Sequence, residues 1–284
     1  MQAAANDIIF EAAISNTGTA AQNVKVAGSI TYNANIVFAD TSAGKIIPGG
    51  TNDTIATTLG YKAINTGNYT AKMRAMSDSI APTTIISKTF SVTDTVYARD
   101  AGTAGAGYFM VSESCGGSEI GNVYDMYADQ TATSISAHIN NITVPGGVIY
   151  AIIYASDLAT IVAQTDYITV TAADKNKLMY LPLLNAVDLK ADSTYFVAVG
   201  SEQSTSDSIG ISVSGTSAIQ TSFLLDKDNC NGNGAGTWYY ITGTPMVRIN
   251  FSVCAALSAS ISASSRDSIA ESLSSKPAKR SRHS

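Results

Sequence analysis

The sequence predicts an all-β protein: an immunoglobulin-like seven-stranded sandwich followed by a jelly-roll-like sandwich and a disordered C-terminal tail. From Asp7 to Cys254, short runs of apolar and polar residues alternate, which is the period of strands with one buried face. Turn residues interrupt these runs at intervals of about 8–12 residues, a spacing typical of β-sandwiches. We therefore expect one sandwich over residues 1–96, a second over residues 97–254, and a tail over residues 255–284.

The N-terminal part is expected to supply seven strands. They are placed at residues 8–14, 24–30, 36–39, 45–47, 54–59, 69–75 and 85–92. Tyr69 enters the sixth strand after a glycine turn, as the tyrosine of a tyrosine corner does in immunoglobulin-like sandwiches. The alternative is an ordinary core aromatic.

The C-terminal part is expected to supply about ten strands, as a jelly roll requires. They are placed at residues 108–111, 123–128, 134–139, 148–154, 160–169, 178–184, 195–199, 210–213 and 222–225, with a closing hairpin of residues 238–242 and 247–253. A helical turn is expected at residues 171–176.

The charges are divided between the body and the tail. The chain has a net charge of -5, while the residues after Cys254 carry a balance of +3, which leaves about -8 on the body. An acidic body repels nucleic acid and anionic membranes, so neither is an expected partner. No apolar run reaches the length of a membrane span, and no signal peptide is visible. Either the protein is cytosolic or the chain is an internal fragment, and we favour the fragment because the strand pattern begins at Asp7 without a lead-in. The Ser- and Ala-rich tail lacks the large apolar residues that offset chain entropy, which predicts disorder.

Three cysteines allow one disulfide and one free thiol. The predicted closing hairpin would bring Cys230 close to Cys254, within bridging reach. The alternative is that both are small buried thiols. If Cys230 and Cys254 form a disulfide, Cys115 is the free thiol.

Several phrases of the sequence are similar to the C-terminal region of secreted Bacteroidota proteins of the type IX secretion class. The matching phrases lie at residues 96–100, 121–124, 132–135, 163–167, 171–174, 181–183 and 193–200. In that group a CARDB-like sandwich and a jelly roll often precede a sorting domain, and residues 271–279 resemble the start of such a domain. The resemblance implies an extracellular or cell-surface location. It supplies no catalytic residue.

Bacteroidota proteins are O-glycosylated at Asp, then Ser or Thr, then an aliphatic residue or Thr, and six such triplets occur in this chain. Their candidate acceptors are Thr54, Ser79, Thr95, Ser193, Ser208 and Ser268. Composition alone predicts about two such triplets, so their number favours a glycoprotein, although Ser- and Thr-rich turns also produce them.

The densest polar loop is a candidate calcium site. It offers oxygen donors from Asp226, Asp228, Asn229 and Asn231, the ligand type that calcium requires. However, Cys230 and Thr237 stand where an EF-type loop needs oxygen ligands, and the alternative is a solvated loop. Calcium is the one cofactor that the sequence suggests.

Trp238, Tyr239 and Tyr240 form an aromatic run suited to stacking on sugar rings. Strand alternation places Trp238 and Tyr240 on one face and Tyr239 on the other, so only part of the run is available to a ligand. The alternative is core packing for all three.

These features favour a non-catalytic extracellular structural or adhesion module, with a cell-surface glycan or a protein as its partner. His138, on the polar face of its strand, is interpreted as a surface histidine, and no sequence motif marks an active site. The alternative function is a carbohydrate-binding accessory domain of a larger secreted hydrolase. An enzyme is not expected.

Overall fold

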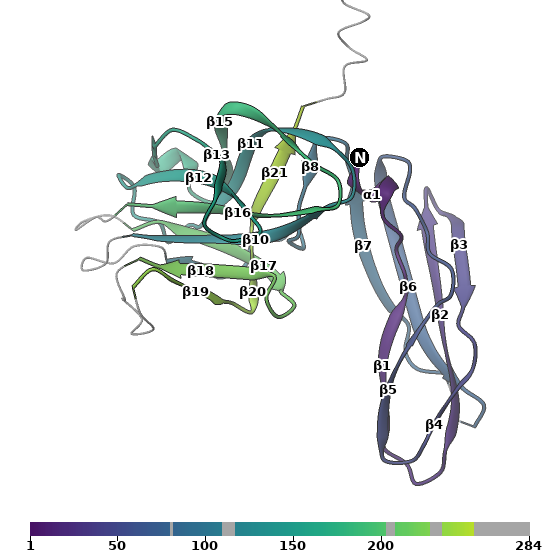
Figure 1. Ribbon diagram of the computed structural model, residues 1–284. Helices are drawn as coiled ribbons and strands as arrows, with labels where there is room; N and C mark the ends of the chain where they lie inside the picture. The colour runs from purple at the N-terminus through teal and green to yellow at the C-terminus, as the bar shows by residue number, and fades with distance from the viewer. Residues whose placement is uncertain (80–81, 110–116, 203–207, 228–234, 253–284) are drawn as a thin grey trace, which may run out of the picture. The chain divides into compact units, whose positions relative to one another are not determined.

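The structure is a computed structural model that describes residues 1–79, 82–109, 117–202, 208–227 and 235–252. Within these residues the only helical elements are the short helix α1 (Gln2–Ala5) and the 3-10 turn η1 (Ala172–Asp174), which coincides with the predicted helical turn. All strand pairs are antiparallel (Figure 1). The prediction of an all-β fold is therefore confirmed. Among the described residues no helix has the length and apolar character needed to cross a membrane.

The N-terminal part contains all seven predicted strands. They are β1 (Glu11–Asn16), β2 (Gln22–Tyr32), β3 (Asn35–Thr41), β4 (Lys45–Ile47), β5 (Thr51–Ala56), β6 (Gly67–Ser77) and β7 (Ile86–Val92). β1 pairs with β5, and the other sheet has the order β3-β2-β6-β7 with β4 also beside β2. This is the arrangement of the C′CFG sheet and the B–E pair of immunoglobulin-like sandwiches.

Tyr69 forms a tyrosine corner at the start of β6. Its side chain is 1% exposed, and its hydroxyl donates a hydrogen bond of 2.9 Å to the carbonyl of Asn65, four residues upstream. Position and bond together confirm the tyrosine-corner interpretation. The ring stacks on Tyr32 at 4.6 Å and on Phe90 at 5.2 Å between ring centroids, so the corner is built into the core.

Among the described residues, the C-terminal sandwich has fourteen strands. They are β8 (Val96–Tyr97), β9 (Gly107–Phe109), β10 (Ser118–Met126), β11 (Gln130–Ile139), β12 (Val148–Ala155), β13 (Ile161–Gln164), β14 (Ile168–Thr169), β15 (Lys177–Leu189), β16 (Ser193–Ser201), β17 (Gly210–Thr216), β18 (Ser222–Asp226), β19 (Thr237–Tyr240), β20 (Gly243–Pro245) and β21 (Val247–Phe251). Each predicted strand coincides with at least one of them.

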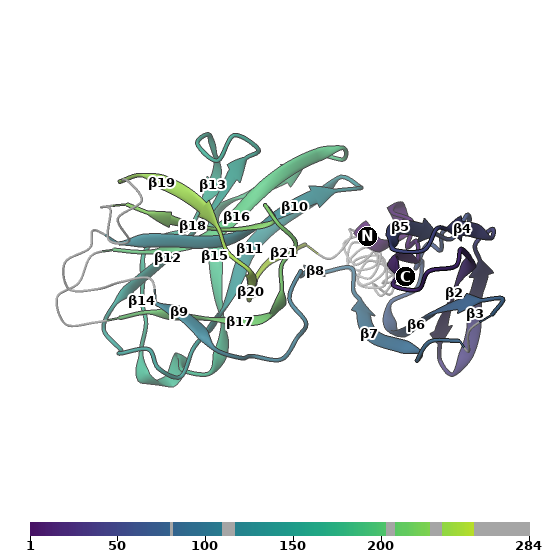
Figure 2. The same cartoon turned by 90° about the horizontal axis from the view of Figure 1, so that it is seen from below.

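These strands form two facing sheets (Figure 1; Figure 2). The first, here called the front sheet, has the order β13-β12-β16-β10-β18-β19, with β14 also beside β12. The second, here called the back sheet, has the order β20-β17-β11-β21-β8, with β15 beside β11 and β9 beside β17. The long strands alternate between the sheets along the chain, as in jelly-roll sandwiches. Between the sheets lies one apolar core, in which Ile120, Ile135, Ile153, Val197 and Ile249 are all fully buried.

The predicted closing hairpin is wrong. β19 pairs with β18 in the front sheet, whereas β21 pairs with β11 and β8 in the back sheet. The segment predicted as their turn contains β20, which pairs with β17, so the chain crosses there from one sheet to the other. Alternation showed that both segments are strands but carried no information about their partners. The argument for a Cys230–Cys254 disulfide loses its basis, and all three cysteines lie outside the described residues, as does the tail predicted to be disordered.

Candidate functional site: an aromatic groove on the front sheet

The outer surface of the front sheet carries aromatic residues where a solvated sheet would carry polar ones. Phe223 is opposite Tyr240, and Leu225 is opposite Trp238, so these side chains share the outer face. Tyr239 is opposite Leu224 and packs with it against the core between the sheets. The predicted division of the aromatic run between two faces is therefore confirmed.

These outer residues border a groove of about 500 Å³. We call it the aromatic groove and define it by Val123, Leu158, Phe196, Phe223, Trp238 and Tyr240. Its volume lies within the range of small-ligand sites. Tyr240 is 51% exposed, while Trp238 and Phe223 are half-buried, so the ring surfaces are partly open to solvent.

The rings meet edge to face. The Trp238 ring lies 4.8 Å from Phe196 and 6.0 Å from Tyr154 between centroids, each at an interplanar angle of 80°. Phe196 meets Phe223 at 5.9 Å and 88°. These are favourable geometries for aromatic pairs, so the rings hold one another in place before any ligand arrives.

Gly121 explains how rings from distant strands reach one another. Phe196 belongs to β16 and Trp238 to β19, with β10 and β18 between them. Gly121 on β10 is paired with Ala198 and Phe223 and adds no side chain to this part of the surface. A Cβ at this position would stand 2.0 Å from the carbonyl oxygen of Val197, so any larger residue would push β10 and β16 apart.

Leu158 is held against the groove by a strained turn. Its φ is +57°, a left-handed conformation that is uncommon for a branched apolar residue. The Asp157 carboxylate accepts hydrogen bonds from the backbone of Ala159 and from the backbone and hydroxyl of Thr160. These bonds, led by that of the Thr160 hydroxyl, lower the pKa of Asp157 to about 2, so the carboxylate is ionised and the turn is fixed.

The groove is apolar but has polar groups at its rim. Ser156, Thr194 and Gln220 line it, and none of its lining residues in the described part of the chain carries a charge. Such a surface offers flat apolar faces together with a few hydrogen-bonding groups. It can accept a neutral ligand that has an apolar face and hydroxyls at its edge.

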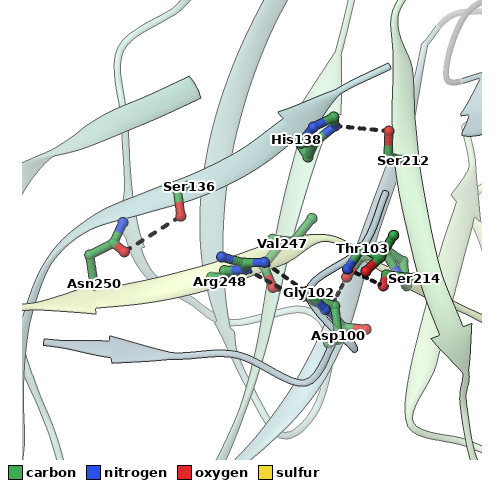
Figure 3. A network of polar contacts seen from close by, with 12 residues as sticks. Asp100, Gly102, Thr103, Ser136, His138, Ser212, Ser214, Val247, Arg248 and Asn250 are labelled. Atoms are coloured by element: carbon green, nitrogen blue, oxygen red, sulfur yellow. Dashed lines mark hydrogen bonds and ion pairs between the residues drawn. The ribbon is translucent and has the colours of Figure 1, made fainter. Parts of the chain in front are cut away.

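The outer surface of the back sheet differs from that of the front sheet because it carries a network of polar contacts (Figure 3). There Arg248 of β21 donates two parallel hydrogen bonds of 2.7 Å to the carboxylate of Asp100, which also accepts one from the backbone of Gly102. The Thr103 backbone N–H donates to the hydroxyl of Ser214. These contacts fix the segment around Asp100 across the sheet and leave both charges paired.

His138 belongs to this polar surface and makes a contact that resembles part of a hydrolase site. Its Nδ1 lies 2.9 Å from Oγ of Ser212 (Figure 3). However, Ser212 is fully buried, so its Oγ is closed to a substrate, and the neighbouring Asp100 carboxylate is engaged by Arg248. Asn140 Nδ2 also donates to the same Oγ, at 2.9 Å. We interpret this set as a structural network that holds His138 neutral.

We expect His138 to titrate below 6.5. Burial and then the positive charge of Arg248 lower its pKa, and the carboxylate of Asp100 opposes them. Because the folded state disfavours the protonated ring, this group contributes stability above pH 6.5 that is lost as the pH falls through the lower folded value. Proton NMR of the ring signals across pH 4–8 will measure it, and a His283→Gln variant will assign the two histidines. A folded-state pKa at or above 6.5 would contradict the network.

Of the four candidate calcium ligands, the structure describes only one. Asp226 is buried at the end of β18, while Asp228, Asn229 and Asn231 lie outside the described residues. Within the described part of the chain, no three His, Cys, Asp or Glu side chains come together as a metal site would require. Calcium binding stays a prediction.

The O-glycosylation candidates also stay predictions. Thr54 and Ser79 are exposed. Thr95, Ser193 and Ser208 are half-buried, and Ser268 lies outside the described residues.

The sequence reasoning found Trp238 and Tyr240 but not the other walls of the groove. Phe196, Phe223 and Leu158 come from separate strands and a turn, and each looks like an ordinary core residue in the sequence. The one available signal was the β18 run around Phe223 and Leu225, in which apolar residues occupy both faces.

Comparison with known proteins assigns the chain to no family. No protein-family model matches the chain, and no curated protein matches it. One similar solved structure comes from work on the structural basis for the promiscuous specificity of carbohydrate-binding modules from the β-sandwich superfamily. It is 12% identical, with a TM-score of 0.23, and the match covers 73% of this chain and 94% of that one.

Proposed function

We propose that this chain is a non-catalytic extracellular binding module that holds a neutral glycan in the aromatic groove. The observation that carries the proposal is the partly open ring surface of Phe223, Trp238 and Tyr240 on the outer face of a sheet, where the described lining residues carry no charge. Pyranose rings present apolar C–H faces that stack on aromatic rings, and their hydroxyls accept and donate hydrogen bonds at the edge.

Strain at the rim supports a binding role. Leu158 and Gln220 both have positive φ, at +57° and +60°. Such conformations cost free energy and cluster at ligand sites, where the surrounding structure maintains them. The rest of the proposal rests on the resemblance of the sequence to secreted Bacteroidota proteins of the type IX class: secretion or surface display, with adhesion through the bound glycan.

A glycan array followed by titration calorimetry tests the groove. We expect Tyr240→Ala to weaken binding of the best neutral glycan by about tenfold or more, because one stacking ring is removed from a partly exposed site. Tyr240 is already 51% exposed, so this variant should fold normally.

Tyr180→Ala is the matched control. Tyr180 is 62% exposed and lies on β15, in the back sheet. Its loss should leave glycan affinity unchanged. No binding of any neutral glycan by the unmodified protein, or equal losses in the two variants, would refute the proposal.

A further inference from the structure

A buried carboxylate lies on the same outer face as the aromatic groove. Glu119 of β10 is 3% exposed and points to the side of the front sheet that carries Tyr150 and Tyr154 of β12. Burying an isolated carboxylate costs free energy unless it is hydrogen-bonded and paired with a charge. The partners of Glu119 therefore indicate its role.

Each oxygen of Glu119 has its own tyrosine. Tyr150 donates to Oε1 at 2.5 Å, and Tyr154 donates to Oε2 at 2.8 Å. Lys227 completes the set, with Nζ 3.4 Å from Oε1 and 2.6 Å from the Tyr150 hydroxyl. Burial and then the negative charge of Glu119 raise the pKa of both tyrosines, so both hydroxyls stay protonated and act as donors.

The rings of the two tyrosines contact different neighbours. The Tyr154 ring packs edge to face with the Trp238 ring, with centroids 6.0 Å apart and an interplanar angle of 80°. It also stacks on Phe196, at 6.3 Å between centroids. The Tyr150 ring instead contacts Tyr167 at 5.1 Å, and covers Gly200. Only the Tyr154 branch therefore reaches the aromatic groove through a described ring contact.

We infer that Glu119 is a positioning residue of the aromatic groove: its carboxylate anchors Tyr154, and Tyr154 holds the ring of Trp238 in the orientation that receives the ligand. This inference rests on the proposed function for its effect on glycan affinity. Its effect on Trp238 itself is independent of any ligand. A ring fixed before binding loses less conformational freedom when the ligand stacks on it, which increases affinity.

Trp238 is the single tryptophan of the chain, so its fluorescence reports the positioning directly. Tyr154→Phe and Tyr150→Phe each remove one hydroxyl donor from the same carboxylate and keep the ring. We expect Tyr154→Phe to shift the emission of Trp238 to longer wavelength and to increase its quenching by acrylamide, in the absence of ligand. Tyr150→Phe should match the unmodified protein in both measurements, although it also removes a partner of Lys227.

Two variants of Glu119 complete the test. Glu119→Gln keeps an acceptor and a donor for the two hydroxyls, so its quenching should lie between those of the unmodified protein and Glu119→Ala. On the best neutral glycan, Tyr154→Phe should weaken binding by about threefold to tenfold and Tyr150→Phe should not.

The outcomes separate the two proposals. Unchanged Trp238 fluorescence in Tyr154→Phe, or equal changes in the two tyrosine variants, overturns the positioning role whether or not a glycan binds. Selective changes in Tyr154→Phe support it. If those changes occur while the unmodified protein binds no glycan, the positioning of Trp238 stands and the proposed ligand is wrong.

Discussion

Replacing Asn122 with alanine is expected to destabilise the C-terminal sandwich by about 3 kcal/mol. Asn122 is fully buried on β10 of the front sheet. Its Nδ2 donates to the carbonyls of Pro245, at 2.9 Å, and Val247, at 3.3 Å, which belong to β20 and β21 of the back sheet. Its Oδ1 accepts from Ser222. One side chain therefore bridges the two sheets, and its removal leaves buried polar groups unpaired.

Denaturant unfolding monitored by Trp238 fluorescence measures this effect, since Trp238 lies in the same sandwich. Tyr124→Phe is the graded control. Its hydroxyl also donates to the carbonyl of Val247, at 2.5 Å, but that carbonyl keeps Asn122 as a second donor. We expect a loss of about 1 kcal/mol. Asn122→Asp should lower the free energy of unfolding more than either of these variants, because it turns a negatively charged oxygen toward two carbonyls. A smaller loss for Asn122→Ala than for Tyr124→Phe would contradict the bridging role.

Strands such as β2 and β5 were predictable because their residues alternate between a buried and a more exposed face, whereas β12 of the C-terminal sandwich is buried on both faces. Alternation therefore located β1 to β7 individually, and Tyr69 could be assigned because a tyrosine corner depends on local sequence, a glycine turn before a strand. Pairing is a long-range property. The wrong hairpin of β19 with β21 arose because adjacency in sequence was taken as adjacency in space.

The candidate site was predictable only in part, for the same reason. Trp238 and Tyr240 are conspicuous because they stand together in the sequence. Glu119 was missed because its tyrosine partners are 31 and 35 residues away and nothing local marks a buried carboxylate. The ion pair of Asp100 could not be predicted either, since its partner, Arg248, is 148 residues distant.

The contrast between the two outer surfaces of the C-terminal sandwich supports placing the proposed glycan site on the front sheet. On the back sheet, Asp100 and Arg248 satisfy each other, and Ser212 is bonded to His138 and Asn140. Those polar groups are occupied within the fold. On the front sheet the rings of Trp238 and Tyr240 remain partly open, and exposed apolar surface of this kind marks an interaction site.

Arg248→Ala is expected to cost about 3–5 kcal/mol of the free energy of unfolding, because it leaves the Asp100 carboxylate buried without its partner. The two side chains are 17% and 0% exposed. The Lys45–Asp53 pair provides the comparison, with the same distance of 2.7 Å but side chains 48% and 39% exposed. Lys45→Ala should cost far less than Arg248→Ala, since water and salt screen an exposed pair.

Two further measurements separate loss of the ion pair from simple loss of packing. A double variant, Asp100→Ala with Arg248→Ala, should be less destabilised than the sum of the single variants, since no unpaired charge remains. In Arg248→Ala the pKa of His138 should rise toward its ordinary value, because the positive charge that lowers it is gone and the negative charge of Asp100 is no longer neutralised. Additive losses, together with an unchanged His138 titration, would show that Arg248 stabilises this surface by packing alone.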